Sequence, residues 1–145
     1  MSGIHFDAVY SSPMLRALRT AELAGFDDPQ VTPLLKEFDY GSYEGLTTKQ
    51  IRESDPGWDL YRDGCPNGES PAQVYARAGR FIDLATSRGE GRAIAFGHGH
   101  ILRAIAVAWI SADITIATHL QLDVATLSIV CDADHGRVIA QWNAK

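Results

Sequence analysis

The sequence predicts an α/β fold in which strands and helices alternate along one chain of 145 residues. Two apolar segments with strand character, residues 5–12 and 92–98, each run directly into a segment with helical periodicity. Such alternation is typical of a layered sheet that is covered by helices. Because domains commonly contain about 100–200 residues, we expect residues 1–145 to form a single domain.

The chain opens with a predicted strand and helix. Residues 5–12, HFDAVYSS, combine apolar and aromatic residues and run into a proline, which favours a short buried strand. Residues 12–25, SPMLRALRTAELAG, predict a helix with Ser12 as its N-cap and Pro13 at its first position. Gly25 is expected to end this helix.

The next part of the chain is expected to be less regular. Residues 31–41, VTPLLKEFDYG, predict an extended segment that ends in a loop. Residues 47–54, TTKQIRES, predict a helix that stops before Pro56. Residues 57–70, GWDLYRDGCPNGES, are expected to form a long polar connection.

The second half predicts two helices, one strand and a hairpin. Residues 70–89 form an amphipathic pattern that Ser-Pro opens and glycine closes, and residues 100–111 form a second helical pattern. Between them, residues 92–98 read as a strand. Two alternating strands within 125–143 are expected to form a hairpin around a turn at 134–136.

Composition argues against several kinds of partner. The net charge is −5 and the basic residues are scattered, so neither nucleic acid nor an acidic membrane surface is an expected partner. Only Cys65 and Cys131 are present, without metal-type spacing, which favours a reducing cytoplasm, with a single disulfide as the alternative. The first residues lack a signal-peptide pattern, and the longest apolar stretch, 101–117, is interrupted by charges, so we expect no membrane span.

Polar residues follow three predicted extended segments at their carboxyl ends. In open α/β sheets, ligands bind outside the carboxyl ends of the strands. Arg16, Glu37 and His98 each follow such a segment, so we expect them to converge although they lie far apart in sequence.

Arg16 and Glu37 each have a functional and a structural interpretation. Arg16 lies in the first helical turn, where an arginine can grip a phosphate, although a solvated helix arginine is the commoner local reading. Glu37 lies in a segment with the apolar residues Leu35 and Phe38, which predicts a raised pKa and a role as proton donor. A surface carboxylate at a strand end is the alternative, and Asp39 and Glu44 are further candidates for the same role.

The GHGH stretch contains the third candidate. His98 stands between Gly97 and Gly99, which let the backbone bend tightly or approach a ligand, and its imidazole can hold an anion or a phosphoryl group. His98 and His100 supply only two metal ligands. Zinc sites use four protein ligands, or three protein ligands and a water molecule. We therefore expect no metal here.

Together these segments resemble the histidine phosphatase superfamily, which includes cofactor-dependent phosphoglycerate mutases and acid phosphatases. FDAVYSSPMLRALRTAEL is similar to the second strand and following helix of the family, and LLKEFDYGSYEGLT is similar to its acid-donor segment. GES before a helix and IAFGHGHILRAIA resemble its later landmarks, in the family's order. The resemblance implies a three-layer α/β/α sandwich of the phosphoglycerate mutase-like type.

The resemblance also assigns roles to individual residues, with no metal and no cofactor. It makes Glu37 the general acid, and it makes His98 the second histidine, which hydrogen-bonds the transferring phosphoryl group. The implied phosphate pocket further contains Arg16, Gly99, Tyr40 and Ser70.

One family motif is missing from the printed sequence. Family members begin with a strand that ends in Arg-His-Gly, whose histidine becomes phosphorylated, and none of the 145 residues forms this motif. The chain resembles the family from its second strand onward, which is compatible with a misplaced start, a fragment of a longer enzyme or a pseudo-enzyme. Without the central first strand the sheet is expected to have free edges, which favour a homodimer, including a strand-exchanged one, or marginal stability.

The resemblance implies phosphomonoester hydrolysis through a phosphohistidine as the leading function. A phosphorylated small molecule is the implied ligand. A phosphatase is favoured over phosphoglycerate mutase-type phosphotransfer, because Phe38 follows the acid glutamate and residues 56–72 lack paired arginines. An inactive phosphate-binding module is the second interpretation, and His98 acting as nucleophile is the least favoured one.

Overall fold

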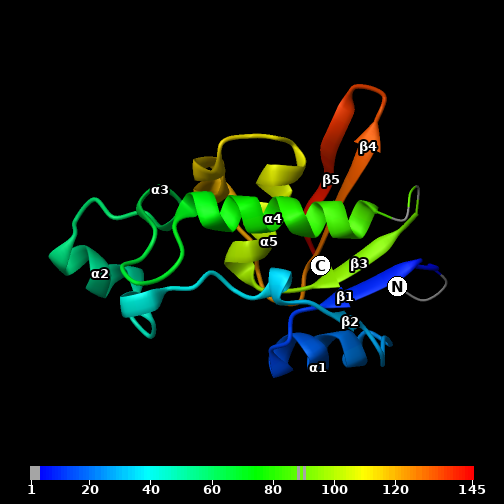
Figure 1. The fold of residues 1–145 in the computed structure, drawn as a ribbon, viewed down its shortest axis with the longest axis horizontal. Coiled ribbons are helices and arrows are strands. Elements are labelled where there is room, and N and C mark those ends of the chain that lie inside the picture. The colour runs from blue at the N-terminus through cyan, green and yellow to red at the C-terminus, as the bar shows by residue number, and fades with distance from the viewer. Residues whose placement is uncertain (1–3, 88, 90) are drawn as a thin grey trace.

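The computed structural model describes residues 4–87, 89 and 91–145, and its centre is a parallel sheet (Figure 1). Strand β1 (Ala8–Ser11) lies between β2 (Gln30–Val31) and β3 (Ala93–Phe96), so the order is β2-β1-β3. Both pairs are parallel, with Ser11 opposite Val31 in one and opposite Phe96 in the other. The carboxyl ends of the three strands therefore lie next to one another, as predicted.

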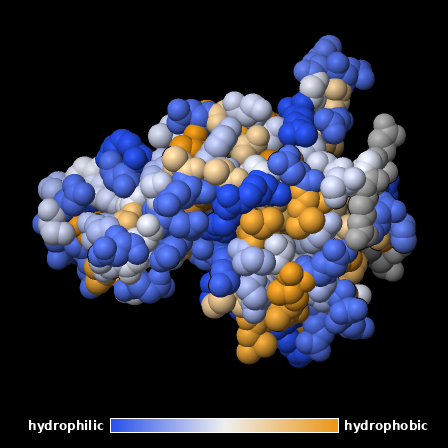
Figure 2. All heavy atoms as spheres, viewed as in Figure 1, coloured by the Kyte–Doolittle hydropathy of each residue, from blue (hydrophilic) through white to orange (hydrophobic). Residues whose placement is uncertain are grey.

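Helices cover both faces of this sheet. Helix α1 (Leu15–Leu23) lies on one side, and α4 (Pro71–Thr86) and α5 (Gly99–Trp109) lie on the other (Figure 1). The predicted three-layer α/β/α arrangement is confirmed. Figure 2 shows apolar surface over α1, which leaves the side chains of Leu15 and Leu23 exposed.

Each face of the sheet has its own apolar core. On the α1 side, Ala17 and Ala21 pack against Ile94 and Phe96 of β3. On the opposite side, β1 packs against α4 and α5, and the ring of Tyr10 meets the ring of Phe81 edge-on. This second core is the larger one, with these among its buried members: Leu35, Phe38, Tyr61, Val74, Ile101, Val107 and Trp109.

Helix α1 begins later than its sequence predicts. Its N-cap is Met14, so the predicted N-cap role of Ser12 and the first helical position of Pro13 are both wrong. Ser12 is fully buried, and its Oγ accepts a hydrogen bond from the N–H of Met14. The helix end agrees with the prediction, because Gly25 follows it with φ of 91°, a conformation that glycine adopts without steric cost.

The predicted polar connection is partly a buried helix. Helix α3 (Leu60–Asp63) lies within residues 57–70, with the Asp59 side chain accepting the Tyr61 N–H at its N-cap. The side chains of Trp58, Leu60 and Tyr61 are buried in the larger core. The prediction of a long polar connection is therefore wrong for residues 58–63, because three apolar side chains among polar neighbours fold this segment inward.

Two other helices begin as predicted. Helix α2 (Thr48–Ser54) has Thr47 as its N-cap, and α4 has Ser70, each in a reciprocal capping box with the residue three positions on. Helix α4 ends at Thr86, and Arg88 of the predicted 70–89 segment lies outside the described residues. Three short 3₁₀ turns complete the helical structure at Pro33–Leu35, Gly41–Tyr43 and Ile114–His119.

The predicted hairpin forms a sheet of its own. Strands β4 (Leu127–Ala133) and β5 (Gly136–Ala144) pair antiparallel with each other, and among the described residues neither pairs with β3. The edge of β3 that faces away from β1 is likewise unpaired within the described part of the chain. Across the residues that the structure describes, none of the helices combines the length and apolarity that a membrane crossing requires.

Candidate active site

Arg16 and His98 meet at the carboxyl ends of β1 and β3. Arg16 lies in the first turn of α1, His98 is the N-cap of α5, and 82 positions separate them in sequence. The Arg16 Nε donates a hydrogen bond of 3.0 Å to the His98 Nδ1. The side chain of Ser12 completes the group, with its Oγ 2.8 Å from the His98 Nε2. The predicted convergence of these two residues is thus present in the fold.

These contacts fix the protonation of His98. Because the arginine can only donate, Nδ1 is the acceptor, and the ring proton of neutral His98 lies on Nε2, which donates to Ser12. Burial lowers the pKa of His98 below its ordinary value, and the positive charge of Arg16 lowers it further, while the charge of Glu37 acts in the opposite direction. His98 is therefore a neutral imidazole at neutral pH.

The Glu37 carboxylate is bound to the first turn of α5. Its oxygens accept hydrogen bonds from the N–H groups of His100 at 3.1 Å and Ile101 at 2.9 Å, and also from the N–H of Phe38 at 2.9 Å. Free N–H groups at a helix N-terminus favour an anion, so α5 stabilises the ionised form of this side chain.

Our expectation of a raised pKa for Glu37 is wrong. Burial alone does raise the pKa, but the His100 side chain beside the carboxylate, together with the N–H groups of Phe38 and His100, outweighs burial and lowers the pKa to about 2. The apolar neighbours in the sequence predict only burial. The N–H donors come from α5, 63 positions away, and are invisible in the local sequence.

His100 links Glu37 to two tyrosines. Its Nδ1 lies 2.5 Å from the Tyr40 hydroxyl and 3.6 Å from the Glu37 Oε2, so the tyrosine is its hydrogen-bond partner. Burial raises the pKa of Tyr40, and the charges of Glu37 and Glu44 add to this effect, so the phenol keeps its proton. The Tyr61 hydroxyl donates to the backbone carbonyl of His100 at 2.8 Å and thereby holds the first turn of α5.

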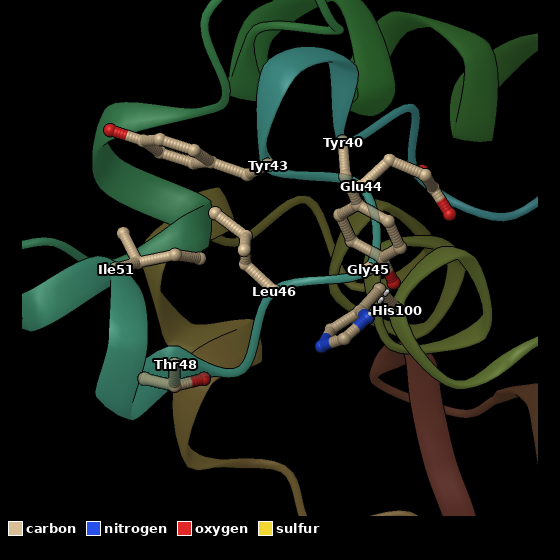
Figure 3. Close-up of a pocket in the computed structure, with 8 residues that line it drawn as sticks. All are labelled: Tyr40, Tyr43, Glu44, Gly45, Leu46, Thr48, Ile51 and His100. Atoms are coloured by element: carbon tan, nitrogen blue, oxygen red, sulfur yellow. Dashed lines mark hydrogen bonds between the residues drawn. The ribbon is translucent and has the colours of Figure 1, made fainter.

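A cavity of about 230 Å³ opens beside this group. His100 and Tyr40 form one side of it, and the chain between the 3₁₀ turn at 41–43 and α2 forms the other (Figure 3). Its lining residues are Tyr40, Tyr43, Glu44, Gly45, Leu46, Thr48, Ile51 and His100. The lining combines aromatic and aliphatic side chains with polar groups, and among the described lining residues Glu44 is the one carboxylate.

The sequence-based search missed the buried ion pair that holds the Glu37 segment. Arg77 of α4 donates to both carboxylate oxygens of Glu69, at 2.8 and 2.7 Å, and to the carbonyls of Leu34, Lys36 and Glu37. Glu69 also accepts the N–H of Asp39. The available signal was the glutamate of the GES motif, because a carboxylate next to a helix N-cap is a natural partner for an arginine two turns along that helix.

The two remaining predicted pocket residues lie at helix N-termini. Gly99 is the first residue of α5, and its N–H has no hydrogen-bond partner among the described residues. Ser70 is the N-cap of α4, where its Oγ accepts the N–H of Gln73, and it is not among the residues that line the cavity. The fold thus brings Arg16, His98 and Gly99 to one place and gives Ser70 a helix-capping role.

No group of three or more potential metal-ligating side chains lies together in residues 4–87, 89 and 91–145. Cys65 and Cys131 are both free thiols.

Comparison with known proteins identifies the family. The histidine phosphatase superfamily (branch 1) matches the chain over residues 1–145. An acid phosphatase from Mycobacterium tuberculosis is 45% identical over 129 residues, which cover 88% of this chain and 63% of that protein. A sedoheptulose 1,7-bisphosphatase from Saccharomyces cerevisiae is 34% identical over 126 residues, which cover 70% of this chain and 46% of that protein.

A solved structure shows the same fold. The structure of an open reading frame from Mycobacterium tuberculosis superimposes with a TM-score of 0.92 at 40% identity, covering 95% of this chain and 72% of that one. The chain covers less than two thirds of the length of the two phosphatases that it resembles in sequence. The family match, the order of its elements and the meeting of Arg16 with His98 agree, and the chain belongs to the histidine phosphatase superfamily.

Proposed function

We propose that this protein binds and hydrolyses phosphomonoesters at the carboxyl ends of β1 and β3. The observation that carries the proposal is the contact between Arg16 and His98, which puts an exposed guanidinium beside a buried neutral imidazole. Only Nε of Arg16 is hydrogen-bonded to another described residue, so both Nη groups are available for phosphate oxygens. The unpartnered N–H of Gly99 is a further donor for the same phosphate.

In the proposed mechanism these groups bind and stabilise the phosphoryl group during its transfer. Phosphoryl transfer depends on positioning and on charge stabilisation, which arginine and N–H donors supply. The resemblance implies a nucleophilic histidine in an Arg-His-Gly motif, which the 145 residues do not contain. We propose that Arg16 and His98 act together with such a histidine, which must come from outside these 145 residues. That histidine accepts the phosphoryl group as the protonated alcohol leaves, and water then hydrolyses the phosphohistidine to phosphate.

Glu37 is the proposed proton donor to the leaving oxygen. It is ionised in the ligand-free site, because its pKa is lowered to about 2. A phosphate dianion that binds at the start of α5 competes for the N–H groups of that helix, and its negative charge raises the pKa of a nearby carboxyl. Substrate binding therefore promotes the protonation that the acid role requires.

Hydrolysis is favoured over mutase-type phosphotransfer. A phosphoglycerate mutase must bind a carboxylate next to the phosphate, and the described residues that line the cavity include neither arginine nor lysine. The curated relatives are an acid phosphatase and a bisphosphatase, which supports the same choice.

The test is hydrolysis of p-nitrophenyl phosphate in the presence of a metal chelator. We expect turnover that His98→Asn and Arg16→Ala each reduce at least tenfold, whereas His135→Asn, in the exposed turn between β4 and β5, retains wild-type activity. Circular dichroism verifies that each variant is folded. Equal activity in all four proteins would contradict the assigned site.

The inactive phosphate-binding module is the second candidate and has a different signature. Phosphate at a hundredfold excess over its Kd stabilises the folded state by about 2.7 kcal/mol. A rise in melting temperature with phosphate that Arg16→Ala abolishes, without any turnover, would establish binding alone. If neither turnover nor stabilisation occurs, the site does not bind phosphate.

We further propose a homodimer and a cytoplasmic location. The unpaired edge of β3 and the separate β4-β5 sheet support association, since free strand edges readily pair with another chain. Light scattering after gel filtration checks the dimer, and a compact monomer that melts cooperatively would contradict it. The two free thiols support a reducing compartment.

A further inference from the structure

The cavity beside Glu37 has a composition suited to an uncharged, hydroxylated organic group. Tyr40 and Tyr43 present aromatic rings, and Leu46, a residue that is 46% exposed, forms an apolar lip. Glu44 and Thr48 add oxygen atoms that bind hydroxyl groups. Rings that cover C–H surfaces, together with a few polar atoms that bind hydroxyls, suit a polyol or a sugar.

One ring nitrogen of His100, the Nε2 atom, points into this cavity. Its Nδ1 is hydrogen-bonded to Tyr40, whereas its Nε2 has no hydrogen-bond partner among the described residues. Figure 3 shows the second nitrogen pointing away from Tyr40, toward the side of the cavity that Leu46 and Thr48 line. Because Tyr40 occupies Nδ1, Nε2 is the ring nitrogen left for a ligand, and a hydroxyl group can pair with it in either tautomer, since a hydroxyl both donates and accepts.

The cavity also lies next to the proposed acid. The Glu37 Oε2 is 3.6 Å from the Nδ1 of His100, and the same histidine lines the cavity. A phosphoester oxygen that receives the Glu37 proton therefore has its carbon substituent at the mouth of the cavity.

The charges around the cavity disfavour an anionic substituent. Glu44 lines it, Glu37 lies on the other side of His100, and none of the lining residues in the described part of the chain is an arginine or lysine. A carboxylate on the substrate would face two carboxylates without an arginine or lysine among the described lining residues, and it would lose its hydration on entry.

We propose that this cavity binds the alcohol portion of the substrate, that His100 hydrogen-bonds one of its hydroxyls through Nε2, and that the site selects polyol or sugar phosphates without a negative charge on that portion. The proposal rests on the proposed phosphatase function and specifies its substrate class.

The test compares two substrates with the same three-carbon skeleton, glycerol 3-phosphate and 3-phosphoglycerate. Their difference is a hydroxymethyl group in place of a carboxylate. We expect kcat/KM for glycerol 3-phosphate to be at least tenfold higher, which corresponds to about 1.4 kcal/mol in the activation free energy. Glu44→Gln should narrow this ratio, whereas Glu53→Gln, on the exposed side of α2 and outside the cavity lining, should leave it unchanged.

The role of His100 is tested with ethyl phosphate, which has no hydroxyl group to bind. His100→Ala should reduce kcat/KM for glycerol 3-phosphate severalfold more than for ethyl phosphate, because any effect on Glu37 is common to both substrates. An equal reduction would restrict His100 to positioning Glu37 and would overturn its binding role.

Binding measurements separate this inference from the proposed activity. If p-nitrophenyl phosphate is hydrolysed but the two three-carbon compounds react equally, the substrate class is wrong and the phosphatase function stands. If no phosphoester is hydrolysed, titration calorimetry with the same two compounds tests the substrate class, and we expect glycerol 3-phosphate to bind more tightly. Equal affinities, or tighter binding of 3-phosphoglycerate, would overturn the inference.

Discussion

The Arg77–Glu69 pair provides the most direct stability test of this structure, because one guanidinium holds both α4 and the Glu37 segment. Replacing Arg77 with methionine keeps an unbranched side chain of similar length but removes five hydrogen bonds, two to Glu69 and three to the carbonyls of Leu34, Lys36 and Glu37. The Arg77 side chain is only 10% exposed, so water does not replace these bonds without local opening.

The expected loss is large for a single substitution. Removing one partner of a buried ion pair costs about 3–5 kcal/mol, because the remaining charge stays desolvated. The Glu69 side chain is 21% exposed and keeps the N–H of Asp39, so we expect the lower end, about 3 kcal/mol. For a chain of 145 residues, this lowers the melting temperature by about 10 °C.

The assay is urea unfolding followed by tryptophan fluorescence and circular dichroism, with Arg80→Met as the matched control. Arg80 lies on the same helix but is exposed, so its replacement should change the free energy of unfolding by less than about 0.5 kcal/mol. A loss below about 1 kcal/mol in Arg77→Met, or equal losses in both variants, would refute the assigned role of the buried pair.

Two further predictions follow from the shifted pKa values. Because the pKa of Glu37 is lowered to about 2 in the folded protein, its contribution is present above the ordinary pKa near 4.5 and is lost as the pH falls toward 2. The shift corresponds to about 3 kcal/mol, so the free energy of unfolding measured with urea should decrease from pH 5 to pH 3, and it should decrease less in Glu37→Gln. An identical decrease in both proteins would contradict the prediction. Burial and the negative charges of Asp39 and Glu44 raise the pKa of Cys65 to about 11, so an aromatic disulfide reagent at pH 8 should modify the half-buried Cys131 first and Cys65 only after unfolding. Rapid modification of both thiols in the folded protein would show that Cys65 is accessible.

Local sequence signals predicted most elements but not all of their functions. Helix α4 was predictable because Ser70, Pro71 and Gln73 form a complete N-terminal signal, and the hairpin was predictable from its alternating strands and turn. Helix α3 was missed because Trp58 and Tyr61 stand among charged residues and glycines, so only their contacts with the core show that they are buried. The capping role predicted for Ser12 failed for a similar reason, since its hydroxyl lies against His98, 86 positions away.

The sequence by itself determined the α/β order of this protein, its family and the identity of the candidate residues, because periodicity, helix caps and short motifs depend on neighbours within a few positions. Only the tertiary structure decided which groups share a site and in what state. The fold brings the His100 side chain and the backbone N–H groups of α5 to Glu37 and lowers a pKa that the local sequence predicts to rise. It also places the Arg16 guanidinium against His98, which puts the ring proton of that histidine on Nε2. Hydrogen bonds and burial depend on distances in space, and a sequence specifies those distances only once the chain has folded.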